Sequence, residues 1–356
     1  AAWIEHIKGH TVETVNYMKR AVPLEHFVFD FKLGITTLKE LKTDHKNEPP
    51  DYYAFRGGKR KGRRGRRGKK PKFPVPDYIS LIKDLKNQQI LPAIYFTFSR
   101  KDAMAKAQEM SKKFDYTTPE EKKQILAYLR ENIPSSISKM ESVQQVRQVL
   151  SKGFGVHHAG ILPQLKEIVE HLFGQGLIKV LFATETFAVG INMPAKTVVM
   201  NGLKKSDGIS VRYLTTKEYF QMAGRAGRRG IDKFGRVIVI ANRNDVDLED
   251  VERVTSKDVE PIISRFSITY NTVLNLVKNH TKAEREVILK SNFGFFMKKS
   301  KNQNRIDQSY INYLRILKRM GYVNEFEDGK GEREYKLTWK GSFATHIFAH
   351  ELMLPE

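Results

Sequence analysis

The chain has 356 residues, 40% of them hydrophobic, and a formal net charge of +22. This length allows two or three domains that each bury a core, and the charge favours a polyanionic partner, nucleic acid before an anionic membrane. The absence of cysteine excludes disulfides and cysteine-based metal sites, and no apolar run is long enough to span a bilayer. We therefore expect no membrane association and a reducing compartment, the cytoplasm, with the nucleus and the plastid as alternatives.

A strongly basic segment lies near the N-terminus. Residues 56–72, RGGKRKGRRGRRGKKPK, contain eleven Lys and Arg and no acidic residue, so their removal would lower the net charge from +22 to +11. The segment is rich in glycine, lacks aromatic residues and repels itself, which predicts a disordered insertion at about 45–76. We expect it to bind phosphates without sequence preference; the alternative is a solvated loop with no further role. The residues that precede it begin as a helix entered partway, and the chain is therefore expected to be a fragment.

Beyond the insertion, helical and strand-like segments alternate. Helical spacing is found in residues 80–90, 101–114, 119–150 and 162–176. Short and almost continuously apolar runs, as in strands buried on both faces, are found in residues 91–99, 153–160, 178–186, 195–202 and 235–242. This alternation predicts an α/β fold, a doubly wound parallel sheet, from about residue 21 to residue 255.

Three polar clusters follow predicted strands: Ser99–Arg100, His157–Gly160 and Thr184–Thr186. Functional residues of doubly wound sheets gather at the carboxyl ends of the strands, so we expect these clusters to lie on one edge. Two adjacent histidines are a poor metal site because neighbouring side chains diverge. They can be ordinary turn residues, and the threonines can simply cap a turn. Gly160, directly before a predicted helix, is a better indication of phosphate binding.

The segment QMAGRAGRRGID (221–232) places three arginines among glycines. Arg225, Arg228 and Arg229 would repel one another on one short turn unless they faced an anion, and glycines let a backbone approach closely. Two interpretations remain open at this point. The turn is either a solvated basic loop or a phosphate-facing element with a guanidinium aimed at a nucleotide.

Four segments in order carry a family resemblance: FTFSR (96–100), GVHHAG (155–160), FATETFAVGINMPA (182–195) and QMAGRAGRRGID. Together they resemble the second RecA-like domain of superfamily-two helicases, and more narrowly the Ski-two-like DExH-box RNA helicases. The resemblance implies a RecA-like domain at 21–255. It implies a winged-helix domain at 256–356, interrupted by a short polar link at about 294–309. Residues 1–20 would then be a partial linker or helix from a missing first RecA-like domain.

The resemblance also implies roles for matching positions. Arg228 matches the arginine finger that stabilises charge on the transferred phosphoryl group, Arg225 a second phosphate contact, and Gln221 the remaining catalytic position. The implied ATP-contacting positions are Gly190, Asn192, Gly224 and Gly227. The implied nucleic-acid contacts are Ser99, Arg100, His158, Gly160, Thr184, Glu185, Thr186, Lys204, Lys205 and Arg212.

Residues 198–215 contain two β-rich arms around an Asp-Gly pair, which predicts a β-hairpin. Related helicases place a hairpin here as a wedge at the duplex junction, and Lys204, Lys205 and Arg212 would give that wedge its charge. The alternative is a connector between two elements.

The departures from the family pattern bear on activity. The sequence has no GxxxxGK[ST] and no Asp-Glu dipeptide, so it lacks the phosphate loop and the DExH box. We expect ATP and Mg²⁺ to be bound mainly by the missing first domain, and the chain alone to be inactive. The implied function is ATP-driven 3′-to-5′ RNA unwinding in RNA processing or decay.

Two alternatives stay open, a DNA-repair helicase of the same superfamily and a non-catalytic nucleic-acid-binding module. The implied partners are RNA, single-stranded or with a 3′ overhang, with DNA as the alternative, and RNA-decay or ribosome-associated proteins. We expect a monomer that binds no metal itself.

Overall fold

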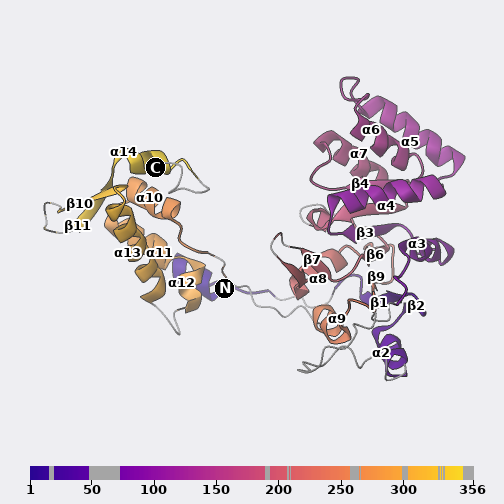
Figure 1. Cartoon of the computed structure of the whole chain (residues 1–356), viewed down its shortest axis with the longest axis horizontal. Coiled ribbons are helices and arrows are strands. Elements are labelled where there is room, and N and C mark those ends of the chain that lie inside the picture. The colour runs from indigo at the N-terminus through magenta and orange to yellow at the C-terminus, as the bar shows by residue number, and fades with distance from the viewer. Residues whose placement is uncertain are drawn as a thin grey trace, which may run out of the picture. The chain divides into compact units, whose positions relative to one another are not determined.

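The computed structural model describes residues 1–15, 20–47, 73–188, 193–206, 208, 210–256, 264, 266–298, 304–327, 329, 331 and 333–347. The chain divides into two compact units (Figure 1). The larger unit is Met18–Glu260, and the smaller unit combines Ala1–Tyr17 with Pro261–Glu356.

The larger unit is built on a seven-stranded sheet in the order β2-β1-β9-β6-β3-β5-β4. Its strands are β1 (Leu24–Asp30), β2 (Gly34–Thr36), β3 (Ala93–Thr97), β4 (Phe154–His157), β5 (Val180–Thr184), β6 (Thr197–Met200) and β9 (Gly235–Ile240). All neighbours run parallel except β1 and β2, which form an antiparallel pair at the edge. The predicted α/β fold is therefore confirmed, and each of the five predicted strands contains an observed one.

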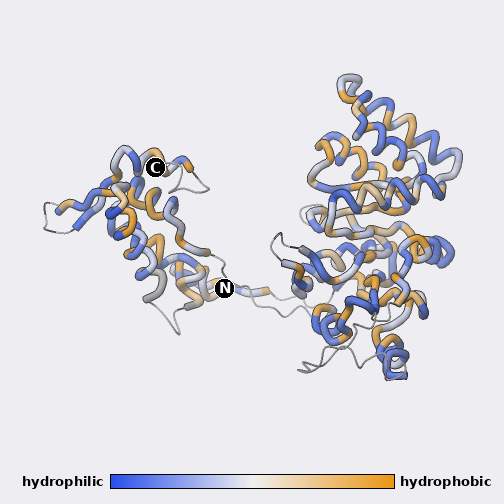
Figure 2. The backbone as a smooth tube through the Cα atoms, in the orientation of Figure 1, coloured by the Kyte–Doolittle hydropathy of each residue, from blue (hydrophilic) through white to orange (hydrophobic). Residues whose placement is uncertain are grey.

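The burial of the central strands accounts for their sequence pattern. Every residue of β3, β4, β5 and β6 is buried, so their apolar runs are continuous instead of alternating. Helices cover the sheet and present alternating apolar and hydrophilic residues along their length (Figure 2). They are α2 (Leu38–Lys46), α3 (Tyr78–Asn87), α4 (Arg100–Lys113), α5 (Pro119–Asn132), α6 (Glu141–Leu150), α7 (Pro163–Gly174), α8 (Thr216–Ala223) and α9 (Leu248–Thr255). Among the described residues, no helix is long and apolar enough to cross a membrane.

The flanks of the predicted insertion belong to the fold. Helix α2 continues to Lys46, so the helical part runs slightly past the predicted start at 45. On the other side, Phe73 exchanges two hydrogen bonds of 2.9 Å with Asn244, which fixes the chain before α3 begins. Residues 48–72, which include the basic stretch, lie outside the described residues.

The smaller unit has a core of its own. Val273, Leu274, Leu317 and Tyr322 are fully buried at its centre. Its elements are α1 (Ala2–Lys8), α10 (Tyr270–Asn279), α11 (Lys282–Lys290), α12 (Phe293–Lys298), α13 (Asn304–Arg319), α14 (Trp339–Ala344) and the hairpin β10–β11 (Val323–Glu327 and Arg333–Leu337). Helices followed by a hairpin are the elements that a winged helix requires, and that assignment stays a prediction.

One expectation about this unit needs revision. The polar link expected at 294–309 is mostly helical, because α12 and α13 occupy both of its ends. The phenylalanines near its start have packing partners, and the ring of Phe293 lies 5.1 Å from the ring of Trp3. The Trp3 indole also donates to the Ser291 carbonyl at 2.9 Å, so α1 packs on this unit.

Candidate functional site

The polar clusters predicted after three strands do meet at one edge of the sheet. A hollow of about 160 Å³ is lined by Arg100 after β3, Ala159 after β4, and Thr184 to Thr186 at the end of β5. A neighbouring groove of about 510 Å³ adds His158 and Gly160 beside the same Arg100. The carboxyl edge therefore gathers residues from three separate segments, as parallel topology requires.

The local geometry of this edge is set by short polar contacts. The Ser99 hydroxyl accepts from the Asp102 backbone N–H at 3.3 Å and caps α4, which leaves the exposed Arg100 at the helix start. The hydroxyls of Thr184 and Thr186 lie 2.9 Å apart at the end of β5. These groups place hydroxyls and a guanidinium around one hollow, a set suited to phosphate oxygens.

Gly160 does not lie directly before a helix, as the sequence suggested. Helix α7 begins only at Pro163, and the Gly160 N–H donates to His158 Nδ1 at 3.1 Å, so it is not presented to a phosphate. Burial lowers the pKa of His158, with Arg100 acting in the same direction, which keeps Nδ1 available as an acceptor. A Cβ on Gly160 would lie 3.2 Å from that ring nitrogen, so the glycine allows the close turn.

The arginine-rich turn lies at the opposite edge. It follows α8 and precedes β9, and it is bonded to the segment entering β6: Ala195 N–H donates to the Arg225 carbonyl at 2.8 Å, and Gly227 N–H to the Ala195 carbonyl at 2.7 Å. Of the two groups of predicted site residues, only the polar clusters therefore lie at the carboxyl ends of the strands. The arginines lie at the amino ends. The sequence did not reveal this because the arginines belong to a connection that starts a strand.

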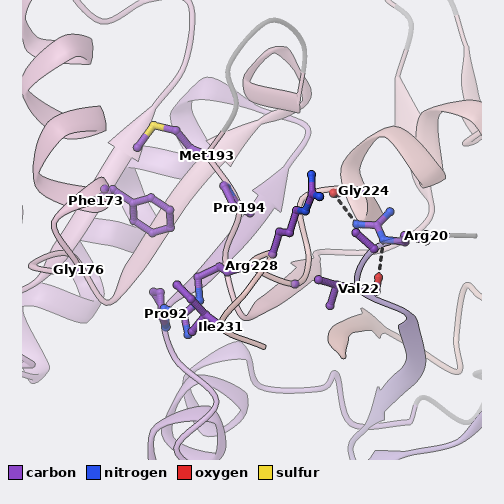
Figure 3. A pocket seen from close by; sticks show the side chains of 14 residues that line it. Arg20, Val22, Pro92, Phe173, Gly176, Met193, Pro194, Gly224, Arg228 and Ile231 are labelled. Atoms are coloured by element: carbon purple, nitrogen blue, oxygen red, sulfur yellow. Dashed lines mark hydrogen bonds between the residues drawn. The ribbon is translucent and has the colours of Figure 1, made fainter. Parts of the chain in front are cut away.

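A cavity of about 560 Å³ opens beside this turn (Figure 3). Pro92, Gly176 and Pro194, which line it, each lie shortly before a strand, in agreement with its position at the amino edge. Arg228 belongs to the turn, and Figure 3 shows Arg20, from the segment before β1, beside Gly224 of the turn. Three arginines, Arg20, Arg228 and Arg229, thus line the cavity.

The two predicted phosphate-binding arginines have different surroundings. The Arg228 guanidinium forms a fork with Asp232, with Nε to Oδ2 at 2.8 Å and Nη2 to Oδ1 at 2.9 Å, and this pairing raises the pKa of Arg228. Arg225 instead donates to the Ala188 carbonyl, and burial lowers its pKa. Arginine stays charged despite such a shift, so Arg225 is a partly desolvated cation.

The other predicted nucleotide contacts are only partly placed. Gln221 is exposed on the last turns of α8, and Gly224 caps that helix. Gly190 and Asn192 lie outside the described residues. Arg229, expected to face solvent or RNA, is exposed.

Arg20 is a site residue that the sequence reasoning missed. Its guanidinium donates to three carbonyls, those of Val22 at 2.7 Å, Gly224 at 2.8 Å and Ala226 at 3.0 Å. These bonds fasten the arginine turn to the strand entry before β1, and they add a positive charge to the cavity wall. No sequence signal marks Arg20, because Gly224 and Ala226 lie 204 and 206 positions away.

Gly227 provides a test of how tightly the turn is packed. Its φ of +88° is strained for other residues, and a Cβ there would lie 2.5 Å from Val22 Cγ1. We expect Gly227→Ala to lower the free energy of unfolding by about 2–5 kcal/mol, the sum of backbone strain and overpacking. Gly230→Ala is the matched control, because Gly230 has a φ of +79° with no atom within 4 Å. Urea unfolding of both variants measures the difference, and equal losses would show that the contact with Val22 is unimportant.

The predicted hairpin is present as β7 (Lys204–Ser206) and β8 (Val211–Tyr213), with antiparallel pairing. Its cations, however, face protein groups instead of a free tip. Lys204 Nζ donates to the Asp245 carbonyl at 2.5 Å and lies over the Tyr213 ring. Lys205 and Arg212 both bind Glu218, at 2.8 Å each. Their proposed role as the charge of a wedge stays a prediction.

Comparison with known proteins agrees with the motif analysis. Residues 106–230 match the family described as the helicase conserved C-terminal domain. Superkiller complex protein 2 of Homo sapiens is 37% identical over 294 residues, which cover 78% of this chain and 24% of the relative. Exosome RNA helicase MTR4 of Homo sapiens is 35% identical over 286 residues, covering 78% and 27%. DExH-box ATP-dependent RNA helicase DExH9 of Arabidopsis thaliana is 33% identical over 320 residues, covering 82% and 31%. The chain therefore spans about a quarter to a third of these relatives.

Proposed function

Because the chain belongs to the Ski-two-like DExH-box RNA helicases and carries their C-terminal helicase domain, we propose that it supplies half of an RNA-dependent ATPase. In this proposal the amino edge of the sheet faces ATP and the carboxyl edge grips RNA. ATP hydrolysis in the longer protein would drive 3′-to-5′ unwinding during RNA processing or decay.

The observation that carries the proposal is the cluster of cations at the amino edge. Arg20, Arg228 and Arg229 line the cavity, and the described hydrogen bonds of Arg20 go to carbonyls alone. Arg225, on the same turn, also donates to a carbonyl, that of Ala188. Guanidinium groups without a carboxylate partner are suited to an anion, and the adjoining cavity gives room for one. A triphosphate therefore fits the residues that are present.

Each arginine would then have a distinct task. Arg225, held at the Ala188 carbonyl, would bind phosphate oxygens in the ground state. Arg228 would give up one of its two hydrogen bonds to Asp232 and contact the phosphoryl group as negative charge develops on that group. A cation accelerates the transfer when it stabilises the transition state more than the ground state. Asp232, nearly buried, holds the guanidinium in a defined orientation until then.

Magnesium ions neutralise phosphate charge in such reactions. In the described ranges no group of three or more His, Cys, Asp or Glu could hold a metal ion. We place Mg²⁺, together with the phosphate loop, in the first RecA-like domain of the longer protein.

RNA is favoured over DNA because the matched relatives include proteins named as RNA helicases. The hollow at Arg100, Thr184 and Thr186 would contact a backbone and does not by itself discriminate between the two polymers. Residues 56–72 would add phosphate binding without sequence preference. We further propose RNA-decay or ribosome-associated proteins as partners, a monomeric state and a cytoplasmic location.

The test compares this chain with a protein in which it is continuous with the first RecA-like domain. We expect the longer protein to hydrolyse ATP in a magnesium-dependent reaction that RNA stimulates more than DNA of the same sequence. The chain alone should show no turnover, because it lacks the phosphate loop. Stronger stimulation by DNA would favour the DNA-repair alternative, and a longer protein without turnover would favour the non-catalytic module.

A further inference from the structure

Lys205 occupies an unusual position at the base of the β7–β8 hairpin. Its side chain is only 11% exposed, and its ammonium group lies 2.6 Å from Glu185 Oε2 and 2.8 Å from Glu218 Oε1. Burial opposes the charge, but the hydrogen bonds from the ammonium group to the two carboxylates raise the pKa of Lys205. A nearly buried lysine between two carboxylates is held in one place, and here it joins three elements: β7, η2 and α8.

The two carboxylates lie at the same edge of the sheet, but they belong to two different elements. Glu185 begins the 3₁₀ helix η2 (Glu185–Ala188), directly after Thr184 at the nucleic-acid hollow. Glu218 lies in the first turn of α8, where its carboxylate completes the capping box with Thr215. Helix α8 ends at Ala223, immediately before the arginine turn. Lys205 therefore connects the segment that we assign to RNA with the helix that leads into the arginine turn.

The same pair of elements is joined a second time. Arg225, just past the end of α8, donates to the carbonyl of Ala188, the last residue of η2. Helix α8 is thus fastened to η2 at its start through Lys205 and at its end through Arg225. A displacement of η2 must either move α8 with it or break one of these contacts.

Nucleic acid can reach this linkage. Lys205 lines the 160 Å³ hollow together with Arg100, Thr184 and Thr186. A backbone phosphate in that hollow would be a third anion beside the lysine and would compete with Glu185, whose side chain is 45% exposed and readily solvated. Glu218 would keep its two hydrogen bonds to Arg212, at 2.8 and 2.9 Å. Its ion pair with Lys205 would weaken or strengthen as the lysine moved.

We propose that the Glu185–Lys205–Glu218 linkage is the coupling element by which RNA at the carboxyl edge adjusts the arginine turn at the amino edge. In this proposal Lys205 and Glu218 are positioning residues that act through η2 and α8. The linkage rests on the proposed function, because it connects the two sites assigned there. Coupling between sites typically amounts to about 5- to 150-fold in an equilibrium constant.

Glu218→Gln is the discriminating variant. A glutamine can still accept from the Thr215 N–H and keep the capping box, but it removes the charge that holds Lys205 and Arg212. In the longer protein we expect RNA stimulation of ATPase, the ratio of rates with saturating RNA and without it, to fall about fivefold or more. The Kd for single-stranded RNA and the RNA-free rate should change less than about twofold, because Glu218 contacts neither ligand.

Glu121→Gln is the matched control. Glu121 completes the capping box of α5 and binds Lys179 at 2.6 Å, so its substitution removes a comparable cap and ion pair that belong to neither η2 nor α8. Its stimulation ratio should stay at the parent value, with thermal unfolding of both variants as a check on folding.

Three results would count against the proposal. A Glu218→Gln protein with the parent's stimulation ratio would overturn the linkage alone. Equal losses in RNA affinity, RNA-free rate and stimulation would show a purely structural role. A parent whose ATPase does not respond to RNA would overturn the proposed function, and the linkage with it.

Discussion

Replacing Arg228 with alanine is expected to lower the rate of ATP hydrolysis by the longer helicase about 10³-fold or more while leaving its RNA affinity unchanged. The guanidinium lies on the cavity side of the arginine turn, at the edge opposite the hollow that we assign to RNA. Removing it therefore removes charge stabilisation in the transition state and no contact with the strand. Steady-state ATPase with saturating RNA and fluorescence anisotropy of labelled RNA measure the two quantities.

The fork with Asp232 has to be controlled for. Asp232 is only 5% exposed on its side chain, so Arg228→Ala leaves a nearly buried carboxylate without its partner and can weaken the fold. The double variant Arg228→Ala/Asp232→Asn removes both charges and should be equally inactive with a restored melting temperature. Arg229→Ala, which removes an exposed neighbouring charge, should retain most of the turnover. Near-normal turnover in Arg228→Ala would mean that the finger is the wrong arginine, and Arg225→Ala is then the next variant.

The fold could be predicted because burial on both faces leaves a plain signal. Strands such as β3 and β5 are buried at every position, and short continuous apolar runs between helical segments are typical of parallel strands covered on both faces. The short edge strand β2 was not anticipated, since three residues with partial burial give no distinct pattern. Helix α12 was missed because its phenylalanines are followed at once by lysines and other polar residues, which are typical of a solvated link.

For the candidate site, the sequence suggested residues but not their hydrogen-bond partners. Motifs identified Arg225 and Arg228, yet nothing in the sequence shows that Asp232 would hold one of them while a carbonyl holds the other. Contacts such as that of Arg20 with Gly224 depend on the path of the chain across the sheet. Lys205 shows the limit most clearly: its local sequence suggested an exposed wedge charge, whereas the fold brings two carboxylates to it.

The second large effect concerns the tip of the β7–β8 hairpin. Replacing residues 207–210 by a two-residue Asn-Gly turn shortens the hairpin while keeping the pairs Lys205↔Arg212 and Ser206↔Val211. We expect unwinding of a duplex with a 3′ overhang to fall about tenfold or more, because a wedge acts through the length and rigidity of its tip. RNA-stimulated ATPase should persist, since both linkages to α8 remain. Strand-displacement and ATPase assays on the same preparation measure the two activities.

Shortening the tip of the β10–β11 hairpin, at 328–332, is the matched control in the smaller unit, and it should leave unwinding unchanged.

The base and the tip of the β7–β8 hairpin are expected to have different functions, which the sequence could not distinguish. Its base carries Lys205 and Arg212, which bind Glu218, whereas the tip begins at Ser206 and Val211, the latter 71% exposed. Loss of unwinding alone assigns the tip to strand separation by steric means, because the cations at the base are engaged with Glu218. If ATPase falls with it, the hairpin is a structural strut for α8; if neither changes, it only connects β6 to α8.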